Sequence, residues 1–304
     1  MEILAENDWH ARREAHEARV RRWIEPRLAR ASRNKRHPVE DFLFEYYAYR
    51  PARLLRWHPG IGVALEGETA REYLSHREYC ETQEGIIVGV FEFSPARMES
   101  IRWLCDMLRR TGERPASFGC FGLHEWAMVH GADSIRHPDW PLRVTFAEIA
   151  RVVESLGLRC THYDAFRFFT PAARPLNKYQ PTREATLALE QSGCLHANMD
   201  LYKWAFKLAP FSSSELVADC FELASRIRTL DMRASPYDLT ALGYPPLRVE
   251  DPEGRAEYEA LQREFARLAS PLRDRLRTVC ESIVERASAG ETDPASARAV
   301  RALP

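Results

Sequence analysis

The chain lacks any apolar run near the roughly 18 to 20 residues that a membrane-spanning helix needs. Its opening residues, MEILAEND, contain neither the basic nor the apolar region of a signal peptide. No internal repeat is visible. We therefore expect a cytoplasmic protein without a membrane partner, and its 304 residues with 45% hydrophobic content are enough for one large domain or two modest ones.

Cysteine pairs are also missing. The seven cysteines are an odd number and include no Cys-x-x-Cys, which argues against a disulfide framework and against a structural zinc site built on thiolates. We expect Cys120, Cys160, Cys194 and Cys220 to be small buried hydrophobic residues rather than nucleophiles. Three of them lie inside the motifs described below, so one can still touch a pocket.

The sequence has little net charge, −1, but its charges are unevenly distributed. Basic residues crowd the N-terminal arm: Arg12, Arg13, Arg19, Arg21, Arg22, Arg27, Arg30, Arg33, Lys35 and Arg36. A basic helical arm can lie along a phosphate backbone, where counterion release supplies affinity independent of sequence. A solvated helix with no ligand is the equal alternative.

Hydrophobic periodicity predicts a mainly helical chain. Helices are expected to about residue 30 with a break near Pro26, and over 94–112, 123–129, 146–156, 182–190, 195–208, 214–230 and 252–284. Short strands are expected at 61–65, 85–91, 116–119, 142–145 and 158–161. Few strands separated by helices indicate a mainly helical α+β single domain with a small sheet. We divide the chain into a basic arm (1–36), a catalytic domain (37–286) and a disordered tail (287–304).

The helix expected over 195–208 is the most informative segment. Its polar residues share one stripe: His196, Asp200, Lys203 and Lys207. Its opposite positions are apolar and can be buried: Leu195, Met199, Tyr202, Phe206 and Leu208. The stripe is either the solvated side of an amphipathic helix or an acid/base pair followed by two cations.

Two further segments mix rings, histidine and carboxylate. In the first, two glycines surround Phe121 before His124, Glu125 and Trp126; of the neighbouring pair His124 and Glu125, at most one should face a site directly. The second segment contains His162, Tyr163, Asp164, Arg167 and Phe168. Three such clusters suggest one shared pocket with stacking walls, hydrogen-bond donors and a carboxylate. Ordinary core packing is the alternative for the rings.

The spacing of His162 and Asp164 fits one face of a strand end, where the two can hydrogen-bond to each other or bind a metal. Histidines 124, 162 and 196 with Asp164 or Asp200 would make a sensible zinc or manganese site, although no His-Glu-x-x-His signature fixes the spacing. A fourth segment, 230–239, contains Asp231, which we expect to form a supporting ion pair with Arg233.

Four motifs, FGCFGLHEWAMV, RCTHYDAFRFFTPAARPLN, GCLHANMDLYKWAFKL and LDMRASPYDL, resemble a bacterial family described as 3-methyladenine DNA glycosylases. The resemblance extends over about residues 37–272. That family is close to glycosylases that defend bacteria against phages with glucosylated modified cytosine. The resemblance therefore implies a hydrolase, a monofunctional DNA N-glycosylase that flips a modified base of double-stranded DNA and leaves an abasic site. Substrates are glucosylated hydroxymethylcytosine in phage defence or 3-methyladenine in DNA repair.

Such an enzyme needs a base held between rings, a carboxylate to stabilise an oxocarbenium-like sugar, and cations for phosphates. We assign the carboxylate to Asp200, with Asp164 as the second choice, and the positioning of water or base to Asn198 or His196. Residues expected to bind the substrate are Phe121, His124, Glu125, Trp126, His162, Tyr163, Phe168, Arg174 and Asn177. Phosphate contacts are expected from Lys203, Lys207 and Arg167.

Two alternatives remain. One is a metal-dependent hydrolase that uses His124, His162 and His196, and the other is a non-catalytic nucleic-acid-binding module. For the glycosylase we expect no cofactor, no bound metal and no obligate protein partner.

Overall fold

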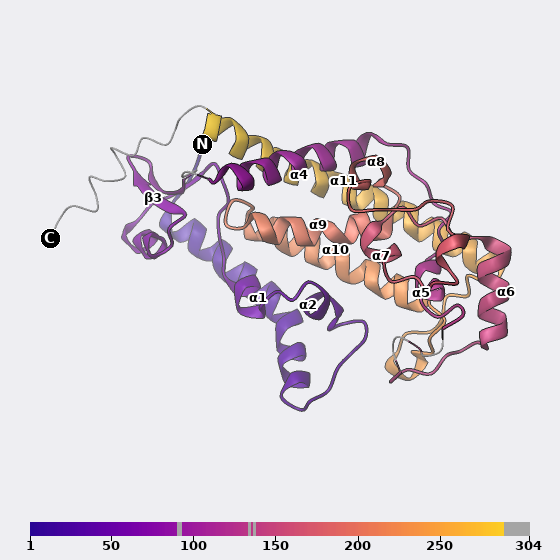
Figure 1. Ribbon diagram of the computed structural model, residues 1–304. Helices are drawn as coiled ribbons and strands as arrows, with labels where there is room; N and C mark the ends of the chain where they lie inside the picture. The colour runs from indigo at the N-terminus through magenta and orange to yellow at the C-terminus, as the bar shows by residue number, and fades with distance from the viewer. Residues whose placement is uncertain (90–92, 133–134, 136–137, 289–304) are drawn as a thin grey trace. The chain divides into compact units, whose positions relative to one another are not determined.

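Residues 1–89, 93–132, 135 and 138–288 are described in the computed structural model of the chain (Figure 1). The protein is mainly helical α+β with one small mixed sheet, as the sequence predicts. The chain folds into two compact units. Unit 1 consists of Met1–Leu108, Tyr202–Phe221 and Leu272–Pro304, and unit 2 consists of Arg109–Leu201 and Glu222–Pro271. The arm (1–36) and catalytic domain (37–286) stay predictions, and the predicted tail lies outside the described residues from 289 onward.

Unit 1 contains the sheet, whose strand order is β1-β2-β4-β3. Strand β1 (Glu2–Leu4) is parallel to β2 (Val63–Leu65), and β4 (Gly85–Val88) is antiparallel to both β2 and β3 (Tyr79–Thr82). Strands are found within the predicted segments 61–65 and 85–91, although β2 begins only at Val63 and β4 ends at Val88, whereas β1 and β3 are too short and polar to have been expected. Glycine is needed at the start of β4, because its φ is +124° and a Cβ there would collide with the carbonyl oxygen of Leu65.

Helix α1 (Glu6–Ala31) continues through Pro26, so the predicted break there is wrong. A proline removes one backbone donor, and the buried Val20 and Ile24 still hold the helix against unit 1. The other helices and 3₁₀ segments assigned wholly to this unit are α2 (Phe42–Tyr46), α3 (Pro51–Leu55) and η1 (Glu68–Ser75). Four helices contribute residues to both units: α4 (Pro95–Glu113), α9 (Leu195–Leu208), α10 (Ser214–Arg233) and α11 (Pro252–Ser288).

The arginines of α1 are largely engaged with acids of their own unit. Arg12 Nε donates to Glu215 Oε1 at 3.0 Å, and Arg19 Nη1 donates to Asp219 Oδ1 at 2.7 Å. Arg30 Nη2 donates to the fully buried Asp41 at 2.6 Å. The fold thus brings acids from distant parts of the sequence to the basic arm, which composition alone does not reveal. These cations support unit 1 instead of forming a free basic surface.

Unit 2 is built around short helices and long loops. They are α5 (Leu123–Ala127), α6 (Phe146–Leu156), α7 (Tyr163–Phe166), η2 (Arg174–Leu176), α8 (Thr186–Leu189) and η3 (Thr240–Leu242). Helix α6 has the predicted bounds because Thr145 and Glu148 form a capping box and Gly157, with φ +68°, ends it. It packs against α5 (Figure 1). Helix α9 likewise has the predicted bounds, and α10 and α11 extend a few residues beyond theirs.

Other local predictions for unit 2 are wrong. The segments 116–119, 142–145 and 158–161 are not strands; the last two form only the isolated bridges Leu142–Tyr237 and Leu158–Asn177. The helix expected over 182–190 is reduced to α8. The sequence of each of the three loop segments alternates as that of a short strand does, and periodicity cannot separate the two.

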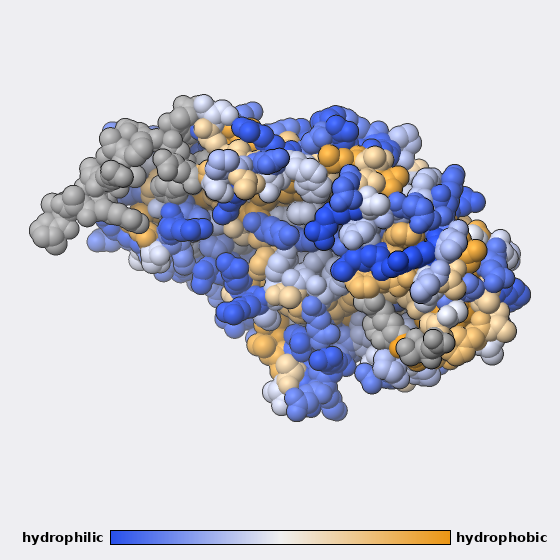
Figure 2. Space-filling view, in the orientation of Figure 1, coloured by the Kyte–Doolittle hydropathy of each residue, from blue (hydrophilic) through white to orange (hydrophobic). Residues whose placement is uncertain are grey.

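No described helix is both long and apolar enough to cross a membrane. On the face drawn in Figure 2, hydrophilic residues predominate and hydrophobic residues reach the surface in separate areas.

Candidate active site

The candidate site lies in unit 2, where α5 begins at a left-handed turn. Phe121 has φ +45° and Gly122 has φ +68°, and a Cβ on Gly122 would lie 3.2 Å from the Tyr258 ring. This turn directs His124 and Glu125 into the interior, where they are 8% and 3% exposed. The expectation that only one of the two faces the site is wrong, because both join the same buried ion cluster.

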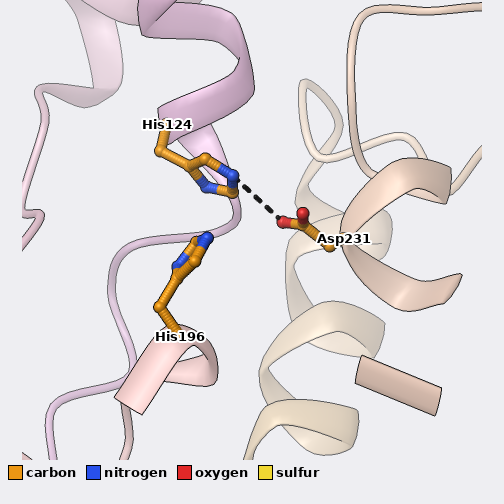
Figure 3. Close-up of side chains that lie close together, drawn as sticks. All are labelled: His124, His196 and Asp231. Carbon is orange, nitrogen blue, oxygen red and sulfur yellow. Dashed lines mark ion pairs between the residues drawn. The ribbon is translucent and has the colours of Figure 1, made fainter. Parts of the chain in front are cut away.

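Arg228 of α10 is the centre of that cluster. Its Nη1 donates to Glu125 Oε1 at 2.9 Å and to Asp231 Oδ2 at 2.8 Å. His124 Nε2 lies 3.4 Å from Asp231 Oδ1 (Figure 3). Burial alone would lower the pKa of His124, but the charges and hydrogen bonds of Asp231 and Glu125 outweigh it and raise that pKa to about 9. Two cations therefore face two carboxylates in a buried environment.

The carboxylate of Asp231 is ionised in this cluster. Burial favours its neutral form, but His124 and Arg228 together hold its pKa below the ordinary value. The predicted ion pair between Asp231 and Arg233 is wrong: Arg233 Nε donates instead to the Pro245 carbonyl at 3.0 Å. Arg228 pairs with Asp231 in place of Arg233, because residues three apart on a helix share a face.

His196, at the start of α9, lies between two other histidines. Its ring is edge-on to His124 at 4.2 Å between centroids, and the two rings point toward each other in Figure 3. It is nearly parallel to His162 at 5.4 Å. Burial and the charge of His124 lower the pKa of His196 to about 3, so it is neutral at neutral pH. The three rings form a row, which we call the histidine row.

The other end of the histidine row faces carboxylates. His162 Nδ1 lies 2.6 Å from Glu190 Oε1, and His162 Nε2 lies 3.9 Å from Asp200 Oδ2. Glu190 and Asp200 are 4% and 5% exposed. Asp164 also lies near His162. The predicted strand alternation does not bring them together, because His162 is the N-cap of α7 and Asp164 lies in the first turn of that helix. Two buried carboxylates thus face one imidazole.

Two sets of side chains in the described part of the chain could hold a metal ion. They are His124, His196 and Asp231, and His162, Asp164 and Asp200, with ligand atoms in each set within 4.8 Å of one another. The three histidines of the predicted metal site are therefore divided between two sets. Arg228 pairs with Asp231 of the first set, and Arg167 lies 3.2 Å from Asp164 of the second, so each set already has a cation against one of its carboxylates.

A cavity of about 30 Å³ adjoins His124 and His196. A space of this size holds roughly one water molecule. Its wall includes Cys120, Cys160 and Cys194, and burial raises the pKa of all three thiols. They are therefore protonated at neutral pH, as expected of inert buried cysteines.

The four rings expected to bind the substrate, those of Phe121, Trp126, Tyr163 and Phe168, do not line this cavity. Trp126 is fully buried and its Nε1 donates to the Ala234 carbonyl at 2.8 Å. The edge of Phe121 meets Tyr258, and Arg167 covers the Phe168 ring at 4.2 Å. Tyr163 has Arg183 over its ring at 6.0 Å. Each ring is thus placed against a protein neighbour.

The predicted rim residues also have structural contacts. Asn177 is 4% exposed; its Oδ1 accepts from Cys160 N at 2.8 Å and its Nδ2 donates to Cys160 O at 2.9 Å. It therefore fixes the loop from inside instead of facing a ligand. Arg174 is exposed and donates to the Arg167 carbonyl at 3.1 Å. Asn198 is fully buried and donates to the Ser192 carbonyl at 2.9 Å.

The residues predicted to bind phosphate have different positions. Arg167 is exposed in unit 2 and lies 3.2 Å from Asp164. Lys203 and Lys207 belong to unit 1, with their ammonium groups over Trp204 at 4.5 and 5.2 Å. The predicted stripe therefore changes along α9: it is buried at Asp200 and exposed at Lys207.

The sequence did not indicate that Arg228 and Glu190 belong to the site, and it did not place Asp231 there. A signal exists for Arg228 and Asp231, since they are charged residues three apart on the apolar face that Ile227 and Leu230 define. Glu190 gives no signal, because a glutamate after a short helix is ordinarily exposed.

Comparisons with protein-family models, with curated proteins and with solved structures find no match to this chain. The site is therefore interpreted from its own chemistry.

Proposed function

We propose that the protein is a hydrolase of the N-glycosidic bond, a DNA glycosylase that removes a modified base. The observation that carries this proposal is the meeting of buried carboxylates and imidazoles along the histidine row. At the His124 end, Arg228 and protonated His124 balance Glu125 and Asp231. At the His162 end, Glu190 and Asp200 are two carboxylates against one imidazole.

Carboxylates at the site suit this reaction, because the bond from the sugar to the base breaks through a transition state in which the sugar becomes oxocarbenium-like. Asp200 would stabilise that positive charge and accept a proton from the attacking water. Glu190 would hold His162 in place behind it. A departing cytosine base, which gains negative charge, would be stabilised by the cationic His124.

Water has a place beside the row. The cavity of about 30 Å³ lies against His124 and His196, and neutral His196 can orient a water molecule without competing for its proton. In the proposed reaction the water oxygen forms a bond to C1′ of the sugar as the bond from C1′ to the base nitrogen breaks. One water proton passes to Asp200. A cytosine base takes up a proton at its ring nitrogen after leaving, whereas 3-methyladenine, which is cationic in the nucleotide, leaves as a neutral base.

The class of substrate comes from the resemblance of the four motifs to DNA glycosylases. The base would be glucosylated hydroxymethylcytosine or 3-methyladenine. To test this, purified protein is incubated with DNAs carrying each modified base, and the released bases are identified by mass spectrometry. Release of free base with formation of abasic sites supports the proposal, and retention of DNA without either product would identify a binding module. Equal plating of phages with glucosylated and unmodified DNA on expressing cells would argue against a defence role.

The role of Asp200 has its own test. Replacing it with asparagine keeps the size and removes the charge, so abasic-site formation should fall by about 10²-fold or more. Asp164→Asn tests the second carboxylate, and Asp251→Asn, at a half-buried position of unit 2 where the carboxylate lies 4.0 Å from Arg248, is the control. Undiminished activity in a folded Asp200→Asn variant would remove Asp200 from the mechanism.

A metal-dependent hydrolase is the second candidate, favoured by the convergence of His162, Asp164 and Asp200. Three protein ligands with an open position are typical of catalytic zinc. Elemental analysis of the purified protein, followed by chelation and re-addition of zinc or manganese, separates the two. Activity that survives chelation supports the glycosylase without a metal.

A further inference from the structure

Unit 1 contains a second pocket, distinct in chemistry from the histidine row. Its volume is about 360 Å³, within the range of small-molecule sites. Five of its lining side chains are cations and one is a carboxylate: Arg53, Arg56, Arg77, Arg97, Lys207 and Glu78. The cations come from four parts of unit 1, namely α3 and its end, the segment before β3, the first turn of α4, and α9. We call this the arginine pocket.

The arginines of the arginine pocket differ in how far the protein engages them. Arg77 pairs with Glu78 at 3.1 Å, and Arg97 lies over the Phe93 ring at 4.7 Å. Neither Arg53 nor Arg56 has an ion-pair partner within the described part of the chain. Clustered cations that are not neutralised by the protein raise the potential of a concave surface and attract anions.

His58 lies in the wall of the pocket, and its pKa responds to this potential. Its Nδ1 lies 2.9 Å from the Tyr79 hydroxyl. Burial and the positive charges of Arg56, His76 and Arg53 lower the pKa of His58 to about 3. An anion in the pocket would oppose that effect and raise the pKa of His58.

The wall is also aromatic. Tyr49 and Phe206 both line the pocket and stack on each other at 3.9 Å, with 7° between their planes. A planar ring can extend such a stack, and arginines bind phosphate oxygens through paired donors. The pocket therefore has a ring stack that can contact the base of a nucleotide and arginines that can bind its phosphate.

We propose that the arginine pocket binds the phosphate group of a nucleotide, with the base against the Tyr49 and Phe206 stack. This site is in unit 1 and does not depend on the proposed hydrolysis in unit 2. The nucleotide is either free or part of a strand, because both carry the same phosphate and base.

Isothermal titration calorimetry on the full chain tests the proposal with three probes at fixed ionic strength: inorganic phosphate, deoxyadenosine monophosphate and a short single-stranded oligonucleotide. We expect the mononucleotide to bind about tenfold more tightly than phosphate, which corresponds to about 1.4 kcal/mol. Tighter binding of the oligonucleotide would identify a strand as the ligand, and equal affinity would identify a free nucleotide. Equal affinity for phosphate and nucleotide would overturn the role of the stack.

The double variant Arg53→Gln/Arg56→Gln should lose this binding, whereas the exposed Arg226→Gln of unit 2 should retain it. Both replaced arginines are exposed, so the variant is expected to fold. A second measurement follows the pKa of His58 by NMR: the nucleotide should raise it in the wild-type protein and not in the double variant. Binding that survives the double variant, or an unchanged pKa of His58 at saturation, would overturn the proposal.

Discussion

The histidine row of unit 2 and the arginine pocket of unit 1 both contain a shielded histidine, yet their pKa values move in opposite directions. The pKa of His124 is raised to about 9 because Asp231 and Glu125 lie against it, and that of His58 is lowered to about 3 because burial is joined by arginines. Burial favours the neutral form in both. At His124 the neighbouring carboxylates outweigh burial, whereas at His58 the neighbouring cations add to it, so the second site is suited to an external anion.

Removing Arg228, the central cation of the buried ion cluster, should have the largest effect on stability. Arg228→Met leaves Glu125 and Asp231 buried without their shared donor, which we expect to cost about 3–5 kcal/mol of unfolding free energy. Urea denaturation measures this loss. The control is Arg226→Met, whose exposed pair with Glu264 at 3.0 Å should contribute less than about 1 kcal/mol. A small loss for Arg228→Met would show that the cluster is not balanced as described.

The pH dependence of stability should differ between the two histidines. For His124 the folded pKa of about 9 exceeds the unfolded value of about 6.5, so its contribution is complete below pH 6.5 and is lost as pH rises through 9. The loss amounts to about 3 kcal/mol at most. For His58 the folded pKa is lower than the unfolded one, so stability is lost as pH falls below 6.5.

Urea denaturation across pH in the presence of a chelator checks both signs. His124→Gln should flatten the alkaline side of the curve, and His58→Gln should reduce the loss on the acid side, to which His196 also contributes. If the alkaline side of the stability curve is unchanged in His124→Gln, the imidazole of His124 is not protonated in the cluster.

The smallest effect is expected for a single arginine of the pocket. Arg56→Gln should change the unfolding free energy by less than about 0.5 kcal/mol, because the side chain is exposed. It should nevertheless raise the pKa of His58, since Arg56 is the strongest of the charges that lower it. NMR titration measures the pKa, and a decrease would contradict the assigned electrostatics.

Local sequence signals were sufficient for much of the helical framework. Periodicity and end signals placed α6 and α9 at their observed bounds, with Thr145 and Gly157 marking the ends of α6. Short segments were misread, because a loop residue that makes one bridge, such as Leu142, alternates like a strand. Prolines 26 and 271 did not break α1 and α11, because neighbouring turns and packing offset one lost hydrogen bond.

The sequence by itself determined that His124, His162, His196 and Asp200 were worth examining, because their residue types and local spacing mark acid/base chemistry. Only the tertiary structure decided how they are arranged. Arg228 and Glu125 are 103 residues apart, and His162 and Glu190 are 28 apart, so no local pattern links them. The sign of each pKa shift likewise depends on which charges folding places beside a buried ring, and that is a property of long-range packing rather than of neighbouring residues.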